Sequence, residues 1–197
     1  MSINNHQPLT TNRKMLNTIL AAIDRSSANE KVFKEALSIA KANRAKLILL
    51  HVLSEEEPGS PVMSLYPSIG DDYHYTHLDP EINVMAHQMY RQQWKAFEKE
   101  GLKILRSFAN IAIASNIETE FTQITGHPSS TICEFASSCK ADTIAIGRRG
   151  YSGLKEMFLG SISNYVVHHA PCSVLLVQTP VSKERVYGER ELEKTYS

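Results

Sequence analysis

Three features are missing from this chain of 197 residues: a net charge, a long apolar run and a pattern of paired cysteines. Lysine plus arginine and aspartate plus glutamate each number 21, so the formal net charge is zero. A global electrostatic attraction to nucleic acid is therefore absent. No apolar run approaches the roughly 18 residues that a membrane-spanning helix needs. We accordingly expect neither nucleic acid nor a membrane as a partner.

Cysteine is scarce, and the cysteines present show no pairing pattern. Cys133, Cys139 and Cys172 are odd in number and contain no CxxC spacing. This argues against both a disulfide framework and a zinc cluster. Buried or half-buried free thiols are expected instead.

The composition along the chain predicts one domain with two tails. Residues 1–14 are polar and lack the apolar middle of a secretory signal, so a flexible tail on a cytoplasmic protein is expected. Residues 15–180 form the predicted domain, and residues 181–197 form a charged tail. Within the domain, residues 54–80 are rich in proline, tyrosine and acids. Such a long loop is predicted to be a lid or a docking arm for an unidentified protein partner, and a surface insertion without a role is the alternative.

Short apolar runs alternate with amphipathic segments through the domain. This alternation predicts an α/β fold with a parallel sheet and helices on both of its faces. The third strand alternates more than the others and is expected nearer an edge. Ser26 or Ser27 is expected to cap the first helix. The predicted strands are 17–23, 45–53, 117–124, 141–146 and 172–177, and the predicted helices are 26–43, 81–114, 129–139 and 161–170.

The chemistry is concentrated in the segment GRRGYSGLKEMFLGSIS, residues 147–163, which leaves a predicted strand and enters a helix. Glycine has no Cβ, so Gly147 and Gly150 allow a ligand to approach the backbone closely. Free N–H groups at a helix start, together with the helix dipole, favour phosphate oxygens. A simple glycine turn is the alternative. The candidate phosphate-binding residues are Gly160, Ser161, Ile162 and Ser163, with Arg148 and Arg149 as cationic donors beside them.

The spacing Gly147-x2-Gly150-x9-Gly160-Ser161 resembles the G-x2-G-x9-G-[ST] signature of ATP-binding universal stress proteins. ILAAIDRS at 19–26 is similar to the opening strand of that family with its terminal Asp. LILLHV at 47–52 and HHAPCSVLLV at 168–177 resemble its second and closing strands. The resemblance covers about residues 16–178. It implies a five-stranded, parallel, Rossmann-like sheet of the adenine nucleotide alpha hydrolase type, and a homodimer.

The resemblance also implies roles for individual residues. Asp24 and the backbone near Ala22 and Val52 would line the adenine and ribose end of the site. The two glycines of the loop would wrap the ribose and phosphates, and the helix start would hold the phosphates. Arg25 departs from the family pattern, in which glycine commonly follows the Asp, and is expected to narrow or recharge the pocket mouth.

These features predict a binding regulator for stress response that takes ATP, with Mg²⁺, rather than a fast enzyme. No GxxxxGK[ST], GxSxG or HExxH motif occurs, and no general base can be named near Gly160. A slow ATPase or phosphotransferase using the same pocket is one alternative, and a regulator that binds AMP or cyclic AMP is another. The loop histidines His74 and His77 and the helical His87 are expected to be solvated rather than metal-bound.

The last predicted strand, residues 172–177, is strongly apolar. In a five-stranded sheet, one such strand has to lie at an edge, where an exposed apolar strand is a hazard unless it is covered. Pairing with the same strand of a second copy would cover it. A homodimer through this strand is therefore expected.

Overall fold

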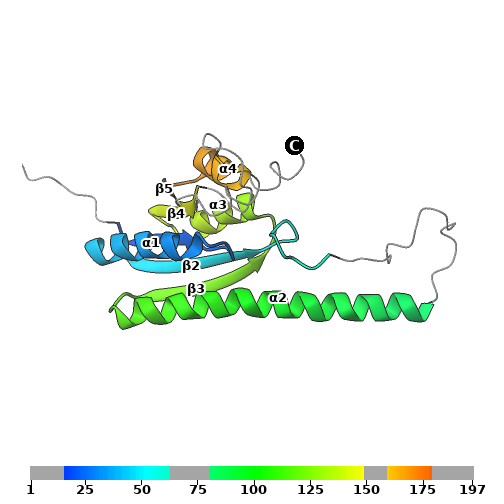
Figure 1. Ribbon diagram of the computed structural model, residues 1–197. Helices are drawn as coiled ribbons and strands as arrows, with labels where there is room; N and C mark the ends of the chain where they lie inside the picture. Colours follow the sequence, from blue (N-terminus) through cyan, green and yellow to red (C-terminus); the bar gives the residue numbers. More distant parts are fainter. Residues whose placement is uncertain (1–15, 63–79, 149–158, 179–197) are drawn as a thin grey trace, which may run out of the picture.

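Five parallel strands form the centre of the protein (Figure 1). The computed structural model describes residues 16–62, 80–148 and 159–178. The strand order β3-β2-β1-β4-β5 and the all-parallel pairing confirm the predicted fold class. The strands are β1 (Thr18–Ala22), β2 (Lys46–Leu53), β3 (Thr119–Thr125), β4 (Thr143–Gly147) and β5 (Ser173–Val177).

The exposure of each strand follows its sequence. The three central strands β1, β2 and β4 are almost entirely buried, as their continuous apolar runs predict for strands covered on both faces. The alternating strand β3 lies at one edge, as expected, and exposes Phe121. The last strand β5 lies at the other edge, where Val174, Leu175 and Leu176 are only partly buried.

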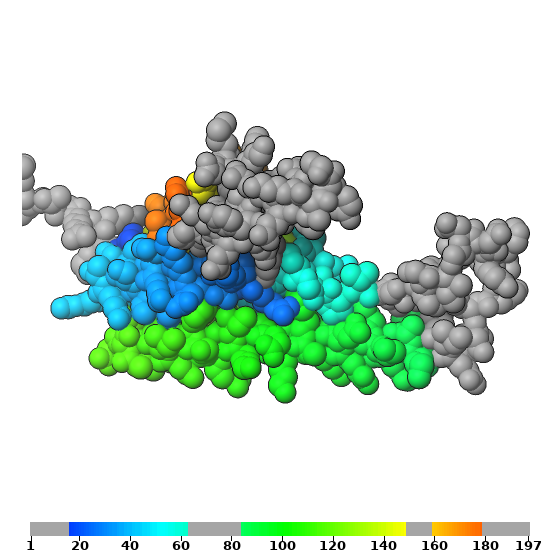
Figure 2. Space-filling model, viewed as in Figure 1, coloured from blue at the N-terminus to red at the C-terminus, as the bar shows by residue number. Residues whose placement is uncertain are grey.

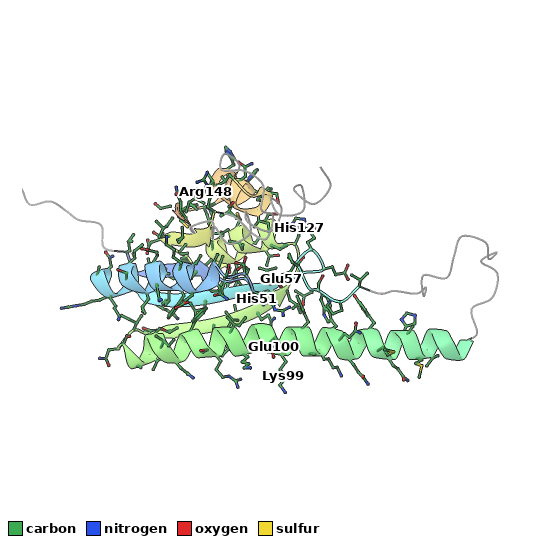
Figure 3. The ribbon with its side chains drawn as sticks, in the orientation of Figure 1. His51, Glu57, Lys99, Glu100, His127 and Arg148 are labelled. Carbon is green, nitrogen blue, oxygen red and sulfur yellow. The ribbon has the colours of Figure 1, made fainter. Side chains whose placement is uncertain are left out.

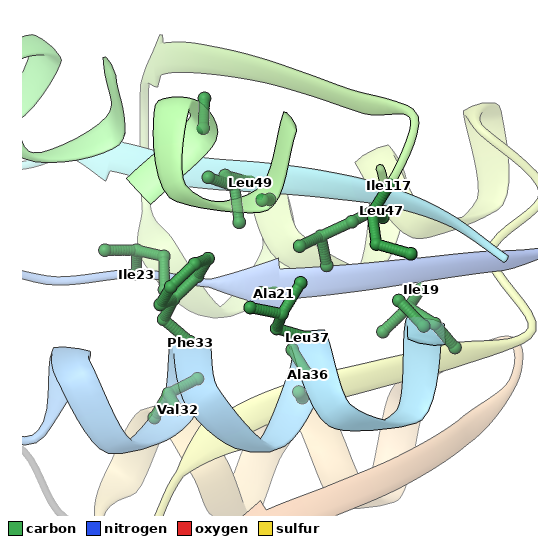
Figure 4. Close-up of a cluster of buried hydrophobic side chains, with 14 of the residues drawn as sticks. Ile19, Ala21, Ile23, Val32, Phe33, Ala36, Leu37, Leu47, Leu49 and Ile117 are labelled. Carbon is green, nitrogen blue, oxygen red and sulfur yellow. The ribbon is translucent and has the colours of Figure 1, made fainter. Parts of the chain in front are cut away.

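In the described part of the chain, four helices cover the two faces of this sheet. Their bounds are α1 (Asn29–Asn43), α2 (Pro80–Ala114), α3 (Pro128–Ser138) and α4 (Ser161–His169). The apolar cluster on one face joins α1 and α2 to the strands, and the cluster on the other face joins α3 and α4 to them. Figure 4 shows the first cluster, in which Phe33 packs among Ile23, Leu37 and Leu49. Phe33 also stacks on Phe108 of α2, with ring centroids 4.4 Å apart.

The expectation that Ser26 or Ser27 caps α1 is wrong. The cap position belongs to Ala28, which has no side-chain cap. The Ser26 hydroxyl instead accepts a hydrogen bond from the Ala28 N–H at 3.2 Å and donates one to Asp24 at 2.6 Å. Ser26 therefore stabilises the tight turn before the helix and does not cap the helix itself.

Helix α2 is much longer than the strand it packs against. With 35 residues it extends for about 52 Å at 1.5 Å per residue. Leu105, Ala109 and Ala112 are buried against the sheet, whereas Met85 and Met89 are exposed. The helix extends past the sheet as a ridge along one side of the molecule (Figures 1 and 2). Within the described ranges, no helix combines the length and hydropathy needed to cross a bilayer.

The cysteines are free thiols, as predicted. Cys133 is buried and Cys139 and Cys172 are half-buried, and burial raises the pKa of all three thiols. The part of the chain that the structure describes contains no group of three or more His, Cys, Asp or Glu arranged to hold a metal ion. His87 is exposed, and His74 and His77 lie outside the described residues.

Candidate nucleotide site

A cavity of about 270 Å³ lies at the carboxyl ends of β1, β2 and β4. The strand order reverses between β1 and β4, and ligands of open α/β sheets bind at such a reversal. The volume is near the lower end of the range of about 300–1,000 Å³ for small-molecule sites. Eight residues named from the sequence line it together: Ala22, Asp24, Val52, Gly147, Gly160, Ser161, Ile162 and Ser163.

The first turn of α4 faces this cavity. The first i→i−4 bond of the helix runs from the Asn164 N–H to the Gly160 carbonyl at 2.8 Å. The N–H groups of Ser161, Ile162 and Ser163 precede that bond, so the helix itself offers them no acceptor. These donors and the positive end of the helix dipole form an environment suited to an anion.

The Ser163 hydroxyl has a different role from the one expected. It donates to the Arg148 carbonyl at 2.9 Å and to the Gly160 carbonyl at 3.0 Å. The Gly160 N–H also donates to the Arg148 carbonyl, at 3.1 Å. The buried Ser163 side chain therefore connects the start of α4 to the end of β4 by hydrogen bonds. Of the two serines at the start of α4, only Ser161 is exposed.

The cationic part of the predicted site is only partly described. Arg148 is not among the residues that line the cavity, and its backbone N–H donates to the Val177 carbonyl at 2.9 Å. Figure 3 shows Arg148 on the side of the molecule that carries α4. Arg149 and Gly150 lie outside the described residues.

Asp24 follows the end of β1 and reaches the cavity wall. Its Oδ1 accepts hydrogen bonds from the Ser26 N–H at 3.0 Å and from the Ser26 hydroxyl at 2.6 Å. Burial raises the pKa of Asp24, the bonds from Ser26 oppose that shift, and the nearby Glu57 charge adds to it. The cavity thus disfavours a further negative charge at this wall.

Arg25 does not lie where the sequence placed it. Its guanidinium carbon is 4.2 Å from the centre of the Phe97 ring on α2, and it is absent from the cavity lining. The expectation that Arg25 narrows the pocket mouth is therefore not supported in the described structure. The cation stacks on an aromatic ring, an attraction of about 0.5–2 kcal/mol, instead of entering the pocket.

The sequence analysis missed a buried His–Glu pair at the cavity wall. His51 and Glu57 both line the cavity and are 2% and 9% exposed. His51 Nε2 lies 3.1 Å from Glu57 Oε2, and the Arg25 N–H donates to Glu57 Oε1 at 3.0 Å. One signal was present in the sequence, because His51 interrupts an otherwise apolar strand.

A second His–Glu pair includes Glu56, which also lines the cavity. Glu56 Oε1 lies 3.0 Å from His127 Nε2, and both side chains are more than half exposed. Glu56, Glu57, Pro58 and Pro128, the residue after His127, all line the cavity.

Comparison with known proteins identifies the family. The model of the universal stress protein family matches residues 15–178. The chain belongs to the universal stress protein family. Among curated universal stress proteins, Slr1101 of Synechocystis is 40% identical over 116 residues, covering 59% of this chain and 96% of that protein. YxiE of Bacillus subtilis is 34% identical over 164 residues, covering 83% of this chain and all of that protein.

Solved structures of universal stress proteins share the fold. One, in complex with cAMP, has a TM-score of 0.55 and 22% identity, and covers 84% of this chain and 99% of that chain. Another, a family protein from Arabidopsis thaliana with AMP bound, has a TM-score of 0.53 and 21% identity, and covers 85% and 94%. At these identities the likeness concerns the fold alone.

Proposed function

We propose that this universal stress protein binds an adenine nucleotide in the cavity at the strand ends and works as a nucleotide-responsive regulator. One observation carries the proposal: the first-turn N–H groups of α4, to which the helix offers no acceptor, and the half-buried Asp24 line the same cavity. This supports a pocket with an anion-binding end and a hydrogen-bond-accepting end. The two solved relatives named above hold cAMP and AMP, which supports the adenine nucleotide class.

Within this class we propose ATP as the ligand. The G-x2-G-x9-G-[ST] spacing supplies backbone donors for a phosphate chain, with Arg148 and Arg149 close by in sequence. The described residues offer no metal cluster, so Mg²⁺ would arrive on the phosphate oxygens rather than on protein ligands. Glu56, Glu57 and Asp24 line the cavity, which is a reason for the phosphates to carry a cation. AMP and cyclic AMP are the competing ligands.

A substitution at the start of α4 tests the site. Gly160 has φ −59° and ψ 151°, angles that other residues adopt, so the backbone strain that glycine would relieve is absent here. Glycine matters at this position because it has no Cβ, which leaves room for a ligand beside Gly160 in the cavity. Gly160→Val should keep the fold and weaken ATP binding about 100-fold, the equivalent of two charge-assisted hydrogen bonds of about 1.5 kcal/mol each.

The matched control is Ala170→Val at the other end of α4, where φ is −63° and ψ is 140°. It adds bulk at nearly the same backbone angles but outside the cavity, so its ATP affinity should equal that of the wild type. Calorimetry measures both affinities, and mass analysis of the ligand released from freshly purified, denatured protein identifies the natural nucleotide. Unchanged affinity in a folded Gly160→Val protein would refute the site.

A slow ATPase or phosphotransferase remains the alternative function of the same pocket. Asp24 Oδ1 already accepts two hydrogen bonds from Ser26, which favours a binding role, whereas the raised pKa of this carboxyl is the property that a general base would need. Turnover well above hydrolysis in buffer, lost in Ser161→Ala, would favour the enzyme.

We further propose a homodimer through β5 and a nucleotide-binding unit of residues 15–180 flanked by two tails. The support for the dimer is the position of β5 at the sheet edge with three partly exposed apolar side chains. The proposed lid in residues 54–80 falls largely outside the described residues, which include only 54–62 and Pro80 of that stretch.

A further inference from the structure

His51 lies between a carboxylate and an amide beneath the cavity. Its Nε2 faces the Glu57 carboxylate at 3.1 and 3.3 Å, and its Nδ1 lies 2.9 Å from Gln123 Nε2. His51 and Gln123 are directly paired residues of the adjacent strands β2 and β3. With the Gln123 amide in this orientation, a neutral imidazole would donate from Nε2–H to Glu57 and accept at Nδ1 from the amide.

The amide side of this cluster can exist in two arrangements. Gln123 Oε1 is buried and has no hydrogen-bond partner within the described structure. The two ends of a glutamine amide have the same shape, so their assignment follows the hydrogen bonding. If the amide rotates by half a turn, Oε1 faces Nδ1 and can accept a proton from it. An imidazolium would then donate to Glu57 through Nε2 and to Gln123 through Nδ1.

Helix α2 packs against the imidazole and keeps it in place while the Gln123 amide rotates. A Cβ on Gly101 would come within 2.6 Å of both Gln123 Nε2 and His51 Nδ1. The helix backbone therefore closes directly over the contact between the ring and the amide. This leaves the rotation of the amide as the simplest response to a new proton.

The groups around His51 are mostly acidic, so a proton on His51 would reduce the negative charge of the cavity wall. Glu57 is a buried carboxylate and Asp24 a half-buried one, both at the cavity wall, and the cavity-lining Glu56 is paired with His127. The Arg25 guanidinium is directed to Phe97 of α2 rather than into the cavity. On α2, Lys99 and Glu100, which precede Gly101, are exposed (Figure 3). A phosphate entering this cavity meets an acidic wall, so an added positive charge there would lower the repulsion.

We propose that His51 takes up one proton when a nucleotide binds, so that the His51–Glu57 pair changes from net negative to neutral as the phosphate enters. The inference rests on the proposed nucleotide binding. The proton leaves a hydronium ion or a buffer acid in the solvent, and its bond to that donor breaks as it bonds to Nδ1. The Gln123 amide then turns its oxygen to the new N–H. His51 is a positioning residue that adjusts the charge of the cavity wall through Glu57. Imidazole suits this role because it changes charge between about pH 5 and 8.

The test is calorimetry of Mg-ATP and AMP binding at one pH in buffers that differ in ionisation enthalpy. The dependence of the observed heat on the buffer gives the number of protons taken up. We expect a measurable uptake, approaching one proton per nucleotide, and an affinity that falls by up to about tenfold per pH unit as pH rises between about 6 and 8. The titration of the nucleotide itself cancels when variants are compared with the wild type.

Two matched variants identify the group. His51→Gln keeps an amide donor for Glu57 but cannot take a proton, so its uptake should be lost. His127→Gln removes the exposed histidine that pairs with Glu56, and the proton uptake should remain in this variant. The ¹⁵N shifts of the His51 ring in the labelled wild-type protein give an independent readout, because both nitrogens should become protonated in the complex. This measurement holds even if His51→Gln does not fold.

The outcomes separate this inference from the proposed function. Nucleotide binding without proton uptake, uptake that persists in folded His51→Gln, or ring nitrogens that stay in the neutral form would each overturn the role of His51 while leaving nucleotide binding intact. A protein that binds neither Mg-ATP nor AMP would overturn the proposed function, and this inference with it.

Discussion

Gly101 is the most informative position for a stability measurement, because the structure gives opposing effects whose sizes can be compared. Replacement of a glycine inside a helix by alanine ordinarily stabilises the helix by about 0.8–1 kcal/mol. Here the new Cβ would lie 2.6 Å from His51 Nδ1, 2.7 Å from His51 Cε1 and 2.6 Å from Gln123 Nε2. His51 is 2% exposed and hydrogen-bonded on both sides, so it has no room to move.

Overpacking of this kind costs about 1–3 kcal/mol, and loss of the hydrogen bond between His51 and Gln123 adds about 1 kcal/mol. After the helix gain is subtracted, we expect Gly101→Ala to lower the free energy of unfolding by about 1–3 kcal/mol. Urea denaturation measures this as a lower midpoint with an unchanged slope.

Gly126→Ala is the matched comparison. Its Cβ would also meet an atom at 2.6 Å, but that atom is the hydroxyl oxygen of Thr131, which can rotate away. The cost should therefore be smaller than at Gly101. If Gly101→Ala were as stable as the wild type or more stable, the close packing of α2 on the His51–Gln123 contact, and the reasoning built on it, would be wrong.

Three further predictions concern other parts of the molecule. The raised pKa of Asp24 means that the folded state holds its proton more tightly than the unfolded state, so this group makes stability fall as pH rises from about 3.8 through the folded-state pKa. Asp24→Asn should remove that part of the pH dependence, and unfolding curves of equal pH slope in both proteins would contradict the burial of the carboxyl. Val174→Lys combined with Leu176→Lys should convert a dimer to a monomer in light scattering at micromolar concentration, whereas a monomeric wild type or a dimeric variant would count against pairing through β5. Leu105→Ala, at a fully buried position of α2, should lower the free energy of unfolding by about 2–5 kcal/mol. Ile113 is 56% exposed on the same helix, so Ile113→Ala should change that free energy by no more than about 0.5 kcal/mol. Equal effects of the two substitutions would show that α2 does not bury the face described.

Much of the fold could be predicted because its signals are local. The apolar runs of β1, β2 and β4 are continuous, so strands buried on both faces were expected and found. Gly147 marks the end of β4 and Gly160 marks the start of α4, and both glycines line the cavity. The start of α1 was less well predicted, since Ser26 forms hydrogen bonds in the turn with Asp24 rather than capping the helix.

The sequence by itself determined the order of the elements and the fold class. It also determined the placing of Ala22, Asp24, Val52 and Gly147 at the strand ends, because chain direction brings the carboxyl ends of parallel strands to one edge. It could not determine the partners of His51, which come from Glu57 six residues later and Gln123 on a neighbouring strand. Nor could it direct Arg25 to Phe97, which lies 72 residues further along the chain. Burial, hydrogen-bond pairing and ring stacking depend on distances in space, and the tertiary structure sets those distances when α2 packs over β2 and β3.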